Sequence, residues 1–382
     1  MKKTMRMMKT SCILASLAII FCGLSTERLF ADMLYTQTNP AGPNAIAAFQ
    51  QNIKTGHLEL KALYPTGGIG NPNFAGCSQD TMVSDGEFLY NVNIGSNDIS
   101  VFRIKGDGSL EQVGNPVPSG GLVPITLAVT HGLLYVGNQG DATTVPANYT
   151  GFAIHDGKLT PIPGSTVTLD VTLPGLPGPA DLQFTQNSKL LMGTRVSANT
   201  VDIFRVTERG LLERTDQLTA PHPFGIGFNP TARGQAIISL EALPGSSSFR
   251  IFSNGHGALL HEALDQAAVD SCWVQIRKDG ELVWLSGFFG QSITLHRLDE
   301  NGVLQPLSLH DTSSFGLFAS DILLDGRQRF LYEVLPGSGQ LHVMHVTGDT
   351  ANGGLADVET ITLPANSFPA GLIIASTSAD GQ

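Results

Sequence analysis

The sequence predicts an all-β protein folded as a seven-bladed β-propeller with four antiparallel strands in each blade. Three observations support this prediction. Charged residues make up only 14% of the chain and Gly, Ser, Thr and Val are frequent, a composition that favours strands and turns over helices. A hydrophobic pair followed by a Gly/Asn/Ser-rich turn recurs seven times, at intervals of 45 to 57 residues. A strand-like segment near the C-terminus has the pattern needed to close a ring.

Each repeat contains the same succession of predicted strands. The second strand of each unit carries the hydrophobic pair, and the seven pairs are Leu34-Tyr35, Leu89-Tyr90, Leu134-Tyr135, Leu191-Met192, Ile237-Ile238, Val283-Trp284 and Leu331-Tyr332. The third strand alternates apolar and polar residues, as in residues 99–104, which is the two-residue period of a half-buried strand. A short fourth strand follows a glycine turn. From the second repeat onward another strand precedes the pair, so each unit has the four strands of a propeller blade.

The first repeat lacks its leading strand, and residues 368–375 supply one. Their sequence, Phe-Pro-Ala-Gly-Leu-Ile-Ile-Ala, is similar to the leading strand of the fifth repeat at residues 223–228. We therefore expect the C-terminal strand to complete blade one. Closing the ring removes exposed sheet edges, whereas a solenoid would leave this strand without a partner.

Residues 1–31 have the features of a secretory signal peptide. A basic start is followed by an apolar run at residues 12–24 and a small residue, Ala31. The run is shorter than the ~20 residues that a membrane-spanning helix needs. Cys22 leaves lipoprotein processing open, although the bulky Phe21 precedes it. We expect residues 32–382 to form a single propeller domain that is periplasmic or secreted, without stable membrane insertion.

Charge and cysteine content narrow the possible partners. The net charge of −11 argues against a nucleic-acid partner. The repeat register places Cys77 in blade two and Cys272 in blade six, too far apart for the ~7 Å between Cα atoms that a disulfide allows. We expect two free thiols and a monomer.

Residues 88–102 and the equivalent segments resemble the repeats of the seven-bladed lactonase family. This family includes bacterial 6-phosphogluconolactonase and fungal carboxy-cis,cis-muconate cyclase. The resemblance covers about residues 33–376. It implies lactone chemistry without a cofactor, carried out by an ionisable cluster of His, Arg and Glu near the central channel. Related repeats also occur in non-enzymatic surface proteins, so the repeats indicate the fold more strongly than the reaction.

Three residues are the candidate catalytic set. His222 lies between two prolines at the entry to blade five and resembles the family's Pro-His element, although Phe224-Gly225 replaces the expected polar continuation. Arg195 and Glu241 follow the second strands of blades four and five. We expect Arg195 to hold an oxyanion or a substrate carboxylate, and His222 to act as the base. Glu241 would orient His222, or act itself if burial raises its pKa.

Six further residues are expected to contact a substrate at the channel mouth: Gln79, Asn138, Asp181, Trp273, Asp321 and Glu333. Each also has a structural interpretation, such as capping backbone amides or packing between blades. The ten histidines show no metal-binding spacing, so neither a metal nor another cofactor is expected. Arg195 is the main cation among the candidates, which disfavours a phosphorylated substrate.

Two functions remain open from the sequence. The first is an exported lactonase, or a muconate cycloisomerase-like enzyme, that hydrolyses or forms a small lactone of the sugar-acid or carboxymuconate type. The second is a non-catalytic propeller that binds a ligand or a protein. A shared pocket for Arg195, His222 and Glu241 would favour the enzyme, and separate turns would favour binding.

Overall fold

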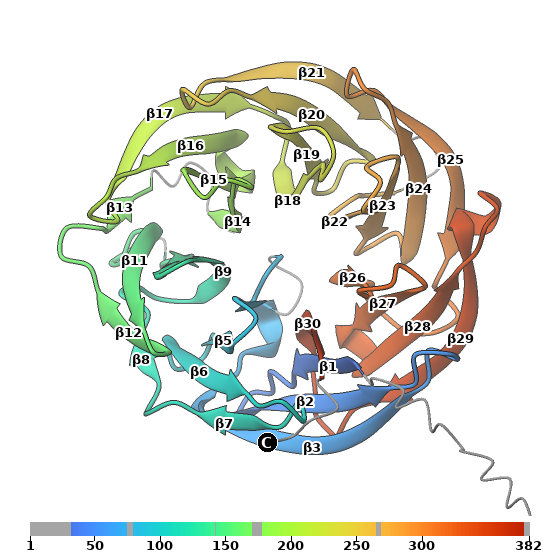
Figure 1. Ribbon diagram of the computed structural model, residues 1–382, viewed down its shortest axis with the longest axis horizontal. Helices are drawn as coiled ribbons and strands as arrows, with labels where there is room; N and C mark the ends of the chain where they lie inside the picture. Colours follow the sequence, from blue (N-terminus) through green and yellow to red (C-terminus); the bar gives the residue numbers. More distant parts are fainter. Residues whose placement is uncertain (1–31, 75–78, 142, 170–177, 265–268, 378–382) are drawn as a thin grey trace, which may run out of the picture.

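The computed structural model describes residues 32–74, 79–141, 143–169, 178–264 and 269–377 (Figure 1). The predicted signal peptide, Cys22 and Cys77 therefore lie outside the described residues. Seven antiparallel blades stand around a central channel, which confirms the predicted fold class. No helix in the described parts of the chain is long and apolar enough to cross a membrane.

From the channel outward, the first four blades are made as follows. Blade one contains β30 (Ala370–Ser376), β1 (Asp32–Gln37), β2 (Pro43–Gln51) and β3 (Leu58–Ile69). Blade two contains β4 (Met82–Ser84), β5 (Phe88–Asn93), β6 (Asp98–Ile104) and β7 (Leu110–Gln112), with β8 (Val117–Pro118) also on β6. Blade three contains β9 (Pro124–Thr130), β10 (Leu133–Asn138), β11 (Asn148–His155) and β12 (Lys158–Pro161), with β13 (Val167–Thr168) also on β11. Blade four contains β14 (Pro179–Phe184), β15 (Leu190–Arg195), β16 (Thr200–Val206) and β17 (Leu212–Thr219).

The remaining blades repeat this order. Blade five contains β18 (Pro223–Phe228), β19 (Gln235–Leu240), β20 (Gly245–Ile251) and β21 (Gly257–Leu264). Blade six contains β22 (Trp273–Ile276), β23 (Leu282–Gly287), β24 (Ser292–Leu298) and β25 (Leu304–Asp311). Blade seven contains β26 (Ile322–Leu324), β27 (Phe330–Leu335), β28 (Gln340–Val346) and β29 (Leu355–Thr362). Four single-turn 3-10 helices lie in loops: η1 (Pro72–Phe74), η2 (Val196–Ala198), η3 (Pro336–Ser338) and η4 (Asn352–Gly354).

The ring closes as the sequence predicts. Strand β30 pairs antiparallel with β1, and Leu34 lies opposite Ile374 while Tyr35 lies opposite Ile373. The first and last strands of the propeller therefore share one blade, and the pairing fixes the ends of the ring to each other.

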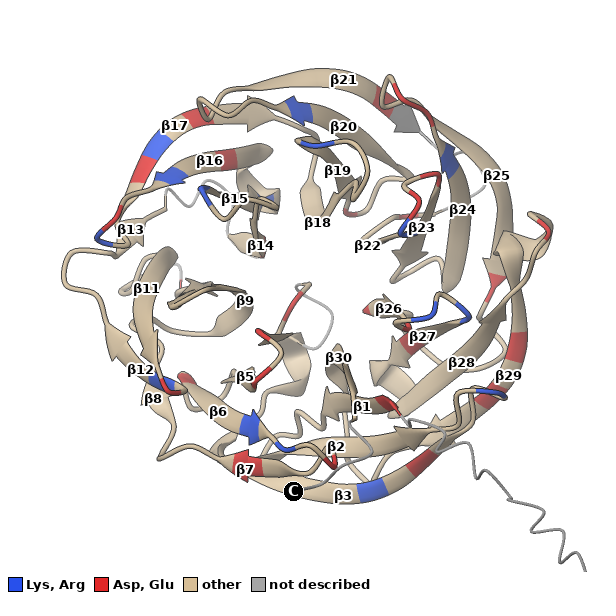
Figure 2. Ribbon diagram, viewed as in Figure 1, with Lys and Arg blue, Asp and Glu red and all other residues tan. Residues whose placement is uncertain are grey.

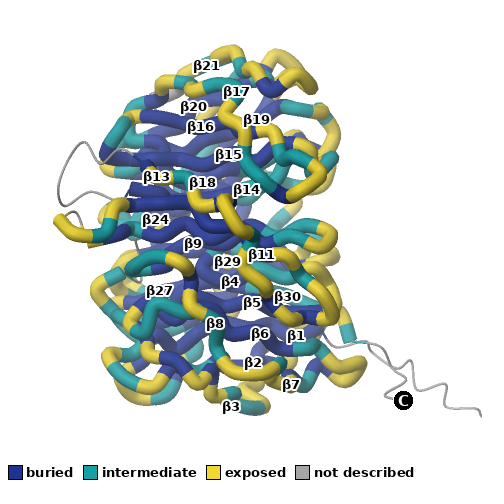
Figure 3. Tube along the Cα trace, turned by 90° about the vertical axis from the view of Figure 1, so that its left-hand side faces the viewer, coloured by how far each residue is buried: buried dark blue, intermediate teal, exposed yellow. Residues whose placement is uncertain are grey.

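The hydrophobic pairs form the seams between blades. In blade one, Leu34 packs in the cluster shared with blade seven and Tyr35 in the cluster shared with blade two. Successive side chains of a strand point to opposite faces, so one pair serves two seams. The buried hydroxyl of Tyr35 donates to the carbonyl of Gly108 at 2.7 Å. Figure 3 shows that the buried residues follow the strands, while exposed residues gather in turns.

Blade five differs from the expected register by one residue. Ile237 packs with residues of blade six, whereas Ala236 and Ile238 pack with residues of blade four. In blade four, Leu191 faces blade three and Met192 faces blade five. The pair in blade five that corresponds to Leu191-Met192 is therefore Ala236-Ile237. A one-residue displacement reverses the face to which each side chain points.

Candidate active site

Gln79, three residues before β4, contacts inner strands of other blades. Gln79 is buried, and its side-chain amide donates to the carbonyl of Ile226 at 3.2 Å. Its Oε1 atom accepts a hydrogen bond from the amide of Val274 at 3.1 Å. These partners belong to the inner strands of blades five and six, so Gln79 ties three blades together across the channel. Figure 2 shows acidic positions on the segments nearest the channel, beside β5 and β26.

Two buried carboxyl groups join neighbouring inner strands. The Oδ2 atom of Asp181 in blade four accepts a hydrogen bond from the amide of Ile226 in blade five at 2.8 Å. Asp321, just before β26, accepts hydrogen bonds from the backbone amides of Ile322 and of Leu372 in blade one. Burial raises the pKa of both carboxyls well above the ordinary value, and the nearby Asp80 raises both further. Burial also raises the pKa of Asp80, to about 7.

A cavity of about 270 Å³ opens among the loops of blades five, six, seven and one. Its lining consists of Pro72, Asn73, Glu241, Cys272, Phe288, Phe289, Phe318, Pro336, Gly337 and Phe368. The rings of Phe288 and Phe318 stack with centroids 4.9 Å apart, and Phe289 meets Phe288 edge-on at 5.1 Å. The lining therefore contains four phenylalanines and three polar side chains, with no Lys, Arg or His among the described residues.

A larger cavity of about 390 Å³ lies between the β14–β15 turn of blade four and the β18–β19 and β20–β21 turns of blade five. It is lined by residues such as Gln186, Arg233 and Phe252. Its described lining residues include none of the predicted site residues and no carboxyl group. The smaller cavity is the better candidate for an active site. A buried titratable group can take part in a reaction, whereas a large volume alone cannot.

Glu241 is the titratable group of the smaller cavity. It is the first residue after β19, and its backbone amide donates to the carbonyl of His222 at 2.8 Å. Its Oε2 atom is buried and makes no hydrogen bond within the described residues. Burial raises the pKa of Glu241 to about 7, and the negative charge of Asp270 adds to the rise. A carboxyl with this pKa can both take up and release a proton near neutral pH.

Asp270 and Cys272 complete the wall behind Glu241. Asp270 is buried and accepts hydrogen bonds from the amides of Phe289 at 3.0 Å and Gly290 at 2.8 Å. Burial raises the pKa of the Cys272 thiol well above its usual value, and Asp270 and Glu241 raise it further. Cys272 is a free thiol, and it remains protonated at neutral pH, which argues against a thiolate nucleophile. Sequence reasoning missed Asp270, although a carboxylate in a loop entering an inner strand was a readable signal.

The structure does not bring the three candidate catalytic residues into one pocket. Arg195 is buried in blade four, where its Nε donates to Asp202 at 2.8 Å and an Nη donates to the other carboxylate oxygen at 3.2 Å. Arg214 approaches the same carboxylate, with its Nε 3.5 Å from Oδ1. Arg195 is not part of the cavity lining. The displaced register of blade five explains the separation, because Glu241 faces blade six and Arg195 faces blade three.

His222 lies beside Glu241 but contacts its backbone. The Nδ1 atom of His222 is 3.2 Å from the backbone carbonyl oxygen of Glu241, so the contact is with the backbone and not with the carboxyl group. The half-buried imidazole does not line the cavity. His222 and Glu241 are thus neighbours, as expected, while the orienting contact expected between their side chains is not present.

The other predicted contacts also lie outside the lining. The Asn138 amide donates to Asn148 at 2.9 Å and ties β10 to β11. Trp273 is buried behind the cavity wall, where its ring packs on Phe224 at 5.1 Å and Phe288 at 6.2 Å. Glu333 is buried near His342, with Oε2 3.3 Å from Nδ1. Of the nine residues predicted for the site, Glu241 alone lines the cavity.

Comparison with known proteins agrees with the fold. Residues 42–162 match the family model described as Lactonase, 7-bladed beta-propeller. No curated protein sequence matches the chain. Among solved structures, a candidate 6-phosphogluconolactonase from Bacteroides fragilis is 19% identical with a TM-score of 0.75, over 92% of this chain and 99% of that one.

A second solved structure, the periplasmic gluconolactonase of Pseudomonas aeruginosa, is 16% identical. Its TM-score is also 0.75, and the match covers 91% of this chain and 99% of that one. The family match over residues 42–162 agrees with the resemblance seen in the repeats, and the similar structures agree with the propeller fold. The chain is a seven-bladed β-propeller that matches the seven-bladed lactonase family over its first three blades.

Proposed function

We propose that this protein is an exported lactonase that hydrolyses a small, uncharged lactone in the cavity at the channel mouth, with Glu241 as the general base. The observation that carries the proposal is the carboxyl of Glu241, which has an unbonded oxygen and a pKa of about 7 in an aromatic cavity. The match to the lactonase family supports the reaction class. The periplasmic gluconolactonase among the similar structures, together with the signal-like residues 1–31, supports export.

The proposed reaction uses one carboxyl group twice. The ionised Glu241 takes a proton from a water molecule as its oxygen attacks the lactone carbonyl carbon. The bond from that carbon to the ring oxygen then breaks, and the protonated Glu241 returns its proton to the departing ring oxygen. The product is the open-chain hydroxy acid, and Glu241 is again ionised.

The lining defines the substrate class. Aromatic rings such as those of Phe288 and Phe318 can cover the apolar face of a lactone ring. The side-chain amide of Asn73 can donate to the carbonyl oxygen, on which negative charge develops during attack. No cation among the described lining residues is available for a phosphate or carboxylate. A neutral aldonolactone or acyl lactone fits this cavity better than a phosphorylated one.

The test compares lactone hydrolysis by the purified protein and by Glu241→Gln, with acid release followed in a pH-stat. The panel contains aldonolactones, a carboxylated muconolactone and acyl-homoserine lactones. We expect kcat/KM to rise with pH through about 7 as Glu241 ionises, and Glu241→Gln to lower kcat by about 100-fold or more. Glu213→Gln, an exposed change on β17, is the matched control and should retain full activity.

Two results would separate the parts of this proposal. A Glu241→Gln variant with the wild-type rate and pH profile would remove Glu241 from the reaction while leaving the lactonase assignment intact. No turnover of any lactone by the folded wild-type protein would favour the second candidate, a binding propeller. The separation of Arg195 from the cavity is the observation that favours this second candidate.

A further inference from the structure

We propose that His310, His342 and Asp357 bind a divalent transition-metal ion of the Zn²⁺ type at the seam between blades six and seven. His310 lies on β25 of blade six, whereas His342 and Asp357 lie on β28 and β29 of blade seven. None of the three lines the cavity at the channel mouth, so this site is separate from the proposed lactonase site.

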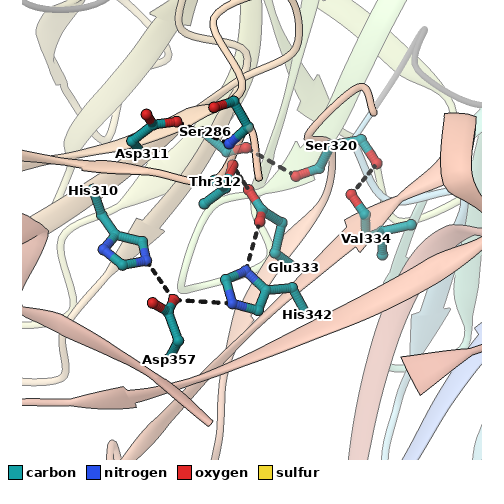
Figure 4. A network of polar contacts seen from close by, with 10 residues as sticks. Ser286, His310, Asp311, Thr312, Ser320, Glu333, Val334, His342 and Asp357 are labelled. Atoms are coloured by element: carbon teal, nitrogen blue, oxygen red, sulfur yellow. Dashed lines mark hydrogen bonds and ion pairs between the residues drawn. The ribbon is translucent and has the colours of Figure 1, made fainter. Parts of the chain in front are cut away.

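The ligand atoms are already gathered. One atom from each residue lies within 4.8 Å of the other two. The Nε2 atoms of His310 and His342 are 2.7 Å and 3.1 Å from the same oxygen, Oδ1 of Asp357. Figure 4 shows the two imidazoles on either side of this carboxylate. Bonds of about 2.0–2.2 Å from Zn²⁺ to imidazole nitrogen and carboxylate oxygen require only a small outward shift of these atoms.

Each ring nitrogen of His342 faces a carboxylate, Nδ1 that of Glu333 and Nε2 that of Asp357. Its Nδ1 atom is 3.3 Å from Oε2 of Glu333, and its buried Nε2 atom makes no hydrogen bond of good geometry within the described residues. A neutral imidazole has a single N–H, so it cannot donate to both Glu333 and Asp357. When Nδ1 donates to Glu333, the lone pair of Nε2 points toward Asp357 and is available to a metal.

The surroundings of His342 are those of a positioned ligand. A carboxylate that holds the far nitrogen of a metal-binding imidazole fixes its tautomer and ring orientation, and Glu333 is placed for this role. The hydroxyl of Thr312 donates to the other oxygen of Glu333 at 3.5 Å. The ring of Phe315 stacks on His342 at 4.2 Å with an interplanar angle of 19°. Both ring orientation and access from one side are thus constrained.

The donor set indicates the class of metal. Two imidazoles and one carboxylate suit Zn²⁺ and its neighbours, whereas Ca²⁺ and Mg²⁺ prefer oxygen ligands. Both imidazoles are buried, while the Asp357 side chain is 40% exposed. Solvent can therefore reach the carboxylate side of the site and supply a fourth ligand. A metal at this position would join blade six to blade seven.

The test uses the full protein, first treated with a chelator and then titrated with Zn²⁺ or Co²⁺. We expect one metal ion per chain, visible absorption bands from Co²⁺, and a Tm about 4 °C higher with Zn²⁺ at about a hundredfold excess over Kd than with EDTA. His310→Asn and His342→Gln should abolish the absorption bands and the difference in Tm. His345→Gln, which changes an exposed histidine on the same strand, is the matched control and should retain both.

The comparison of each variant with and without metal keeps the test independent of any loss of stability that the substitution itself causes. The absence of stoichiometric binding by the wild-type protein would overturn the proposal. Binding that survives in both His310→Asn and His342→Gln would overturn it as well, because the metal would then sit elsewhere.

Discussion

Buried ionisable side chains have different hydrogen-bond partners in the ring of blades and in the cavity at its mouth. In the ring, Asp181 accepts a hydrogen bond from a backbone amide of the next blade, and Arg195 forms an ion pair with Asp202. In the cavity, one oxygen of Glu241 is buried without a hydrogen bond in the described structure. Burial raises the pKa of both Asp181 and Glu241, so a raised pKa alone does not distinguish them. The two carboxyls differ in their partners: hydrogen bonds from neighbouring groups hold the oxygens of Asp181, whereas Glu241 lines a cavity and one of its oxygens has no such partner within the described residues.

The largest effect on stability should come from breaking the ion pair in blade four. Arg195→Met leaves the buried carboxylate of Asp202 with the neutral amide of Gln217 at 2.9 Å and the more distant Arg214. We expect the free energy of unfolding to fall by about 3–5 kcal/mol. Arg214→Met, which removes the half-exposed partner, should cost less than about 1 kcal/mol. Chemical denaturation of both variants measures the difference. A stable Arg195→Met protein that has lost lactone turnover would instead place Arg195 in the active site.

Glu241→Gln should have the opposite effect on stability, and only at higher pH. The folded-state pKa of about 7 lies above the ordinary value of 4.5, so the contribution of Glu241 to stability is fully present below pH 4.5 and is lost as pH rises to about 7. At pH 8 the Gln variant should be more stable than the wild type by up to about 3 kcal/mol, and at pH 4 the two should be nearly equal. Denaturant titrations at the two pH values measure this. A pH-independent difference would mean that the carboxyl is not held in an unfavourable environment.

A smaller loss of stability is expected from the channel carboxyl. Asp181→Leu removes the acceptor of the Ile226 amide, and an unsatisfied buried amide costs about 1–3 kcal/mol. Glu208→Leu, at an exposed turn, should change the free energy of unfolding by less than about 0.5 kcal/mol. Thermal unfolding of the two variants, with lactone turnover measured in parallel, tests the assignment. Lost turnover without lost stability would move Asp181 from the structural ring to the substrate.

The blades could be predicted from the sequence because their signals are local. The two-residue alternation, the glycine turns and the hydrophobic pairs each act within a few residues, and seven repetitions make the pattern unambiguous. In blade five, the prediction of the strand register was wrong. Ala236, Ile237 and Ile238 are all apolar, so the sequence does not reveal which two residues form the pair, and the expected register was one residue off. With this displacement, Glu241 does not occupy the position in blade five that Arg195 occupies in blade four.

The site could be predicted only in part. Glu241 was predicted because it directly follows a second strand, and the structure places it in the lining of the cavity. Asp270 and the phenylalanines of the cavity were not predicted, because the residues around the cavity come from loops of several blades. The cluster of His310, His342 and Asp357 was missed for the same reason: its members come from three strands in two blades and have no motif spacing.

The sequence by itself determined the seven blades, the order of their strands and the closure of the ring by the C-terminal strand. Local periodicity and turn residues are sufficient for this, because each blade is built mainly from neighbouring segments. The tertiary structure alone decided which polar side chains meet. Side-chain direction at a strand end depends on register to a single residue, and the partners that satisfy or expose a buried charge come from the adjoining blade.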